Sequence, residues 1–105
     1  MTTLPGRWAL QMRTPIGSIK AEMTFTGDAY GFAGTAVGKT ETVELQNIRV
    51  VTDVDGEHVT WNQTITKPMR LNLEFDVIIA GDDMHGHSRA GRLPKSIVTG
   101  HHTND

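Results

Sequence analysis

Two histidines, His85 and His87, stand two residues apart within a stretch that alternates apolar and polar residues. In a β-strand, residues i and i+2 project from the same face, so both imidazoles could hold one metal ion. Asp76 and His101 are candidate third ligands. The alternative is a solvated strand face, because the alternation puts both histidines opposite the apolar residues. Matches over such short spacings often arise by chance, and we therefore predict neither a bound metal nor another cofactor.

Asp76 and His87 also form a candidate acid–base pair, since a carboxylate can orient an imidazole for proton transfer. The expected register sets them opposite each other on the polar face, and only a local bulge would turn them inwards. Lys95 is a further candidate. If the arginines on either side of the preceding turn pair, Lys95 falls on the apolar face, where desolvation favours a base or nucleophile. Tyr30 is the fourth catalytic candidate, on the apolar face of its own strand.

The candidate side chains Asp76, His85 and His87 all lie within residues 69–88, and the structure of this segment determines their positions. They read MRLNLEFDVIIAGDDMHGHS, with apolar residues at every second position up to Ile79. This period of two predicts a long strand with one apolar face, followed by a Gly-Asp turn and a returning strand. Pairing Ala80 with Asp83 sets Phe75 beside Ser88 and Asp76 beside His87.

The same hairpin pattern occurs twice upstream. Gly27-Asp28 predicts a turn that sets Phe25 beside Tyr30, and residues 55–57 predict a second turn that sets Val50 beside Gln63. Glycines 27, 56 and 81 would supply the positive φ that two-residue turns need.

Two other segments interrupt or end the pattern. A phase change at Gln46-Asn47 implies either a bulge or a tight turn. We predict that the last strand spans residues 92–100 and that residues 101–105 form a polar tail that frays. The chain is then a single domain over residues 1–105.

The pattern predicts an all-β fold, because no amphipathic helix of useful length is present. Eight or nine antiparallel strands joined by short turns form either an up-and-down barrel or a sandwich. We favour the barrel, which is lipocalin-like, because every connection looks like a hairpin between neighbours and closure removes exposed edges.

Composition narrows the classes of function. A net charge of −2 with scattered basic residues argues against nucleic-acid binding. No apolar run approaches the roughly 20 residues that a membrane helix needs, so we expect no membrane partner. The N-terminus lacks the pattern of a signal peptide, and the chain has no cysteine, which together predict a cytoplasmic location.

Gly6-Arg7-Trp8 at the start of the first strand of an all-β meander resembles the calycin group of lipocalins, fatty-acid-binding proteins and avidins. The ending Thr99-Gly100-His101 resembles small bacterial lipocalin-like domains. The resemblance implies that Trp8 closes one end of the barrel and packs against a basic residue of the last strand. His101, Arg92 and Arg89 are the candidates for that residue. It also implies ligand binding inside the barrel.

The barrel interior is the candidate ligand site. Aromatic residues and methionines dominate the inward face, and a few polar groups could fix the orientation of a ligand. The alternative is a dry core that these side chains simply fill. The candidate ligand-binding residues are Trp8, Met12, Met23, Phe25, Tyr30, Trp61, Gln63, Phe75, Met84 and Ser88.

Three hypotheses of function follow. The first is a barrel that binds a small hydrophobic or aromatic molecule. The second is a small cofactor-independent isomerase, lyase or cyclase that uses a polar residue of the barrel cavity. The third is a homo-oligomer that associates through an outward face containing Val51, Ile78 and Val98.

Overall fold

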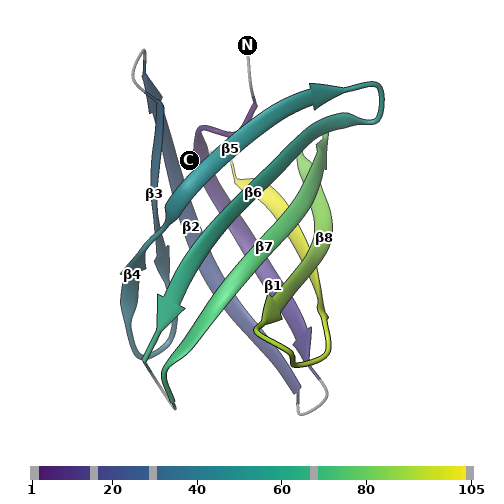
Figure 1. The fold of residues 1–105 in the computed structure, drawn as a ribbon. Coiled ribbons are helices and arrows are strands. Elements are labelled where there is room, and N and C mark those ends of the chain that lie inside the picture. Colours follow the sequence, from purple (N-terminus) through teal and green to yellow (C-terminus); the bar gives the residue numbers. More distant parts are fainter. Residues whose placement is uncertain (1–2, 15–16, 29–30, 67–68, 104–105) are drawn as a thin grey trace.

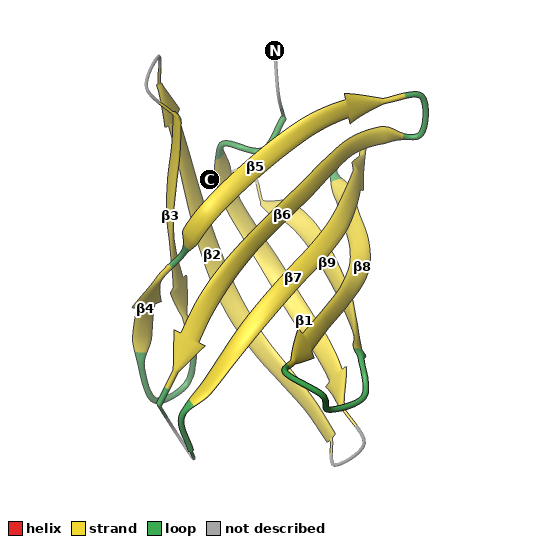
Figure 2. Ribbon diagram, in the orientation of Figure 1, coloured by secondary structure: helices red, strands yellow, loops and turns green. Residues whose placement is uncertain are grey.

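The computed structural model describes residues 3–14, 17–28, 31–66 and 69–103. Within these ranges the chain forms nine strands and no helix (Figures 1 and 2). The strands are β1 (Gly6–Thr14), β2 (Gly17–Asp28), β3 (Gly31–Val37), β4 (Thr42–Glu44), β5 (Gln46–Asp53), β6 (Gly56–Ile65), β7 (Leu71–Ala80), β8 (Asp83–Ala90) and β9 (Ser96–Thr103).

The strands form one antiparallel sheet in the order β4-β3-β2-β1-β9-β8-β7-β6-β5. Consecutive strands pair with each other except β4 and β5, which stand at the two ends of this order, and the pairing of β1 with β9 brings the first and last strands together. The sheet curls into a nearly closed barrel (Figure 1). The prediction of an all-β, up-and-down barrel of eight or nine strands is confirmed.

The chain passes from one end of the sheet to the other through a bend between β4 and β5. Before the bend β4 pairs with β3, and after it β5 pairs with β6. At the bend the Leu45 N–H donates to the Gly34 carbonyl, with the nitrogen 2.9 Å from the oxygen. Next to it the register shifts between Gln46 and Arg49, and Asn47 has a φ of 55°. The phase change in the sequence therefore marks a bulge, which lets one continuous segment leave β3 and join β6.

The register of the β7–β8 hairpin is as predicted. Phe75 pairs with Ser88 and Asp76 pairs with His87. The turn glycine, Gly81, has a φ of 65°, as expected for a two-residue turn.

The registers of the two upstream hairpins differ from the prediction by four residues. Phe25 pairs with Gly34 rather than Tyr30, and Val50 pairs with Val59 rather than Gln63. The first hairpin turns two residues later than expected, and the second turns two residues earlier. In each, a glycine begins the returning strand with a φ near 130° (133° at Gly31, in place of the predicted Gly27, and 127° at Gly56). In both hairpins an Asp is followed three residues later by a Gly, a spacing that favours a type I turn. This preference competes with the predicted turns, which are centred on an earlier glycine in the first hairpin and on a later one in the second. Because each shift is even, the described residues that remain in these strands keep their expected faces.

The last strand begins and ends later than predicted. β9 runs to Thr103, and within it His101 and His102 pair with Ala9 and Trp8 of β1. Residues 101–103 are therefore part of the barrel and not a frayed tail, because β1 supplies backbone partners to the end of the strand. Lys95 precedes β9, is exposed, and does not face the interior as one predicted register required.

The bulge residue offers a test of barrel closure. Asn47 lies in the left-handed region, which β-branched residues disfavour and glycine tolerates. We expect Asn47→Val to lower the free energy of unfolding by about 1–2 kcal/mol, and Asn47→Gly to change it by less than about 0.5 kcal/mol. Urea denaturation measures both, and equal losses in the two variants would contradict the assigned bulge.

Candidate functional site

Three aromatic rings fill the middle of the barrel. Trp61 stacks on Phe75 with ring centroids 4.8 Å apart and an angle of 7° between the planes. Phe25 meets Trp61 edge-on, with centroids 5.3 Å apart. All three side chains are buried. We call them the aromatic cluster. They come from β2, β6 and β7, whose apolar faces the period of two turns inwards.

Two polar side chains, Gln63 and Ser88, lie in the interior beside the aromatic cluster. They are the buried polar residues of the part of the chain that the structure describes, at 5% and 3% exposed. The Trp61 indole N–H donates to the Gln63 side-chain oxygen at 3.1 Å. Within the described residues, neither the Gln63 amide nitrogen nor the Ser88 hydroxyl has a hydrogen-bond partner. Both side chains keep a few per cent of their surface exposed, so water or a ligand that reaches them can use this remaining bonding capacity.

The predicted ligand-binding residues divide into groups along the barrel. Gln63 lies two residues beyond Trp61, towards the β6–β7 connection, and Ser88 pairs directly with Phe75 of the aromatic cluster. Met12 is half-buried near the end of β1. Trp8, Met23 and Met84 are buried. Tyr30, predicted both as a ligand contact and as a catalytic residue, lies outside the described residues.

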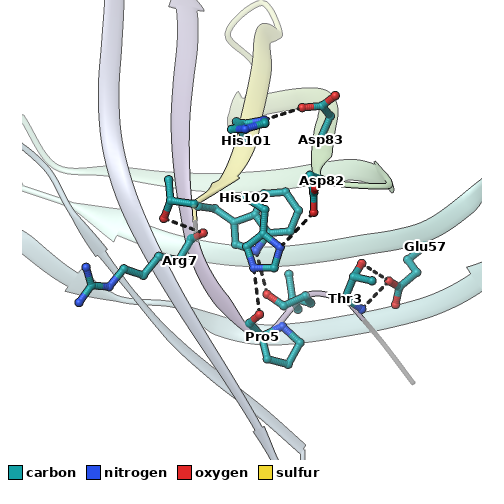
Figure 3. A network of polar contacts seen from close by, with 11 residues as sticks. Thr3, Pro5, Arg7, Glu57, Asp82, Asp83, His101 and His102 are labelled. Atoms are coloured by element: carbon teal, nitrogen blue, oxygen red, sulfur yellow. Dashed lines mark hydrogen bonds and ion pairs between the residues drawn. The ribbon is translucent and has the colours of Figure 1, made fainter. Parts of the chain in front are cut away.

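Residues 3–5 cross one end of the barrel, which we call the strapped end (Figure 3). Leu4 is fully buried there, and its carbonyl accepts a hydrogen bond from the Trp8 indole N–H at 2.8 Å. The Thr3 backbone N–H and hydroxyl both donate to the Glu57 carboxylate, at 2.7 and 2.6 Å. Side chains of β1 and β6 therefore fasten the segment before the first strand over this end.

Trp8 stacks on His102 at the strapped end, with ring centroids 4.3 Å apart and an angle of 2° between the planes. The His102 ring also contacts the Pro5 carbonyl, with Nε2 3.2 Å from the oxygen (Figure 3). Only glycine fits beside it, because a Cβ on Gly6 would lie 2.6 Å from His102 Nε2. A residue of the last strand thus packs on Trp8, as the resemblance implied, but it is not one of the three candidates.

The three candidates for that contact lie elsewhere. His101 points outwards and contacts Asp83 at 2.8 Å, while the Arg89 Nε–H donates to the Leu93 carbonyl at 3.2 Å. Arg92 is exposed. His102 was missed because residues 101–105 were expected to form a tail. Val98 is fully buried, so its predicted place on the outward face was wrong. The parity that His102 shares with the inward Val98 and Gly100 was the signal that could have identified it.

The opposite end, which we call the rim end, carries the connections β3–β4, β6–β7 and β8–β9 (Figure 1). Apolar side chains stay exposed here: Ile19 is 49%, Met69 61% and Leu93 54% exposed. The partly buried Met12 and Leu71 continue this apolar surface towards the core. Among the described residues, no segment crosses this end as residues 3–5 cross the other.

The polar candidates of the sequence lie on the outside of the barrel. His85 and His87 are exposed, and no group of three or more His, Asp or Glu side chains among the described residues could hold a metal ion. Asp76 stands opposite His87 in the register, but its carboxylate contacts His58. The proposed Asp76–His87 dyad is therefore not formed, and both its members face away from the interior.

An open surface depression lies at the strapped end, lined by Pro5, Gly6, Arg7, Thr103 and residues 24–27. Neither Gln63 nor Ser88 lines it. We give more weight to the interior polar pair than to this depression, because unused hydrogen-bonding capacity in an apolar interior is a chemical feature that a ligand can complete.

The neighbouring histidines test the packing at the strapped end. Removing the ring of His102 removes the Trp8 stack and the contact with Pro5, so we expect His102→Ala to lower the free energy of unfolding by about 1–3 kcal/mol. His101→Ala changes an exposed residue of the same type and should cost less than about 0.5 kcal/mol. Urea denaturation followed by tryptophan fluorescence measures both, and equal costs would contradict a structural role of the stack.

Comparison with known protein families, curated proteins and solved structures found no significant match to this chain. In the described part of the chain, no helix is long and apolar enough to cross a membrane.

Proposed function

We propose that this protein is a binding protein for a small, uncharged, hydrophobic or aromatic molecule. The ligand occupies the half of the interior between the aromatic cluster and the rim end. The observation that carries this proposal is the pair of buried side chains, Gln63 and Ser88, whose hydrogen-bonding capacity the described residues leave unused. A ligand that accepts a hydrogen bond from the Gln63 amide would satisfy it.

The surroundings of this pair favour an uncharged ligand. No charged side chain is among the buried residues of the described chain. Moving a charged group into such a site would cost several kcal/mol without a partner. The stacked faces of Trp61 and Phe75 favour a flat ring, and the flexible Met12 can adjust to its edge. The best candidate is therefore an aromatic molecule with a carbonyl group.

The rim end is the proposed route to this site. Its exposed Ile19, Met69 and Leu93 form an apolar surface that an uncharged ligand can meet first. At the strapped end the large apolar side chains Leu4 and Trp8 are fully buried instead.

Binding is favoured over the alternative of an isomerase, lyase or cyclase. Such an enzyme needs an acid or base beside its substrate. Of the four catalytic candidates, Asp76, His87 and Lys95 are exposed and do not lie in the interior, and Tyr30 lies outside the described residues.

We also propose membership of the calycin group and a cytoplasmic location. The stack of Trp8 on His102 of the last strand supports the first, and the absence of cysteine supports the second.

A fluorescent ketone tests the proposed site. The uncharged naphthalene dye 6-propionyl-2-(dimethylamino)naphthalene has the flat ring and carbonyl that the site should accept. We expect it to bind the unaltered protein and Gln63→Leu to weaken its binding about 3–10-fold, because one hydrogen bond to a buried group is lost. A fluorescence titration measures the dissociation constants.

The next residue along β6 provides the matched control. Asn62→Leu makes a comparable change on the outer face and should leave the dissociation constant unchanged. The ketone failing to bind the unaltered protein, or binding equally well to both variants, would overturn the proposal.

A further inference from the structure

Strand β5 ends the sheet and has a free edge. It pairs with β6 on one side, and no strand among the described residues pairs with its other side beyond the bend. In Figure 1, β5 runs away from β3 after the bend. A free edge presents unpaired backbone N–H and C=O groups, which can template pairing with another chain.

The hairpin register shows which groups point outwards. Asp53 pairs with Gly56 across a two-residue turn, which a hydrogen-bonded pair must close. Hydrogen-bonded and non-hydrogen-bonded pairs alternate from there, so Val50 and Thr52 direct their N–H and C=O groups away from β6. No backbone hydrogen bond from either residue to another strand is found in the described chain.

The side chains along the edge of β5 are complementary in charge to those of the same edge in a second, antiparallel copy. On the outer face of β5, Arg49, Val51 and Asp53 follow each other at alternate positions, and all three are exposed. If two copies pair antiparallel about a two-fold axis at Val51, each Arg49 lies opposite the partner's Asp53. In the same register the outward groups of Val50 meet those of the partner's Thr52. Shifting by one pair sets Arg49 opposite Val51 in one direction and opposite Asp55, which lies in the turn beyond the strand, in the other.

We propose that a second copy of this chain pairs with β5, edge to edge, in this register. The two-fold pairing joins two nine-stranded sheets and gives each Arg49 a carboxylate partner. Val51, which is 61% exposed in one copy, packs on its symmetry mate. The contact covers a single strand, so the dimer is weak and forms with rising protein concentration. This inference does not depend on the proposed ligand.

Cross-linking through cysteine tests the contact directly, since the chain has no cysteine of its own. Val51→Cys places two thiols in a non-hydrogen-bonded antiparallel pair, where Cα atoms lie about 4.5 Å apart and a disulfide fits. With oxidised glutathione as oxidant, we expect covalent dimers to form about tenfold faster than in Ile97→Cys. Ile97 is a matched control, because it is 52% exposed on the outer face of β9, whose two edges are both paired.

A charge exchange tests the register. In the Val51→Cys background, Arg49→Asp or Asp53→Arg alone sets like charges opposite each other and should reduce cross-linking to the rate of the Ile97→Cys control. The double exchange restores opposite charges and should recover it. Arg13→Asp makes the same charge change on the outer face of β1 and should have no effect. Equal rates for Val51→Cys and Ile97→Cys, or no recovery in the double exchange, would overturn the proposal.

Discussion

The pairing of the first strand with the last is the constraint on which the rest of the structure depends. β1 and β9 bring together residues almost a whole chain apart, including Trp8 and His102. That pairing closes the long circuit of hairpins, at an entropic cost that grows only slowly with the length of the loop. It also creates the surface on which residues 3–5 lie. The stack of Trp8 on His102 and the burial of Leu4 exist only because these two strands meet.

Closure makes the two ends of the barrel different, and this difference defines the candidate site. At the strapped end, backbone and side-chain hydrogen bonds hold residues 3–5 over a buried core. At the rim end, exposed apolar side chains lead towards Gln63 and Ser88. Between them the aromatic cluster separates the interior into two halves. We propose that a ligand occupies the rim half, whose uncharged lining would favour molecules without charge.

Much of the fold could be predicted from the sequence because a period of two is local information. The alternation in residues 69–88 determined the register of β7 and β8, and it placed His85 and His87 on the outside. The two upstream registers were wrong by four residues because two turn preferences compete within a few positions, and both preserve the apolar face. The inward direction of Gln63 and Ser88 could also be predicted, because the period of two determines the face on which each side chain lies.

The difference between the two ends could not be predicted in the same way. It depends on contacts between distant residues, such as Thr3 with Glu57 and Pro5 with His102. The sequence pattern shows which face a side chain occupies, but not whether its hydrogen bonds are satisfied. The unused bonding capacity of Gln63 and Ser88 is therefore a property of the folded barrel.

The most direct test of a ligand site in the rim half is a nuclear magnetic resonance titration with the uncharged naphthyl ketone. We expect the side-chain amide signals of Gln63 and the methyl signals of Met12 and Leu71 to shift with a single dissociation constant. Signals of Leu4 and His102 at the strapped end should stay in place. Shifts confined to the strapped end or to the outer face of the barrel would contradict the account.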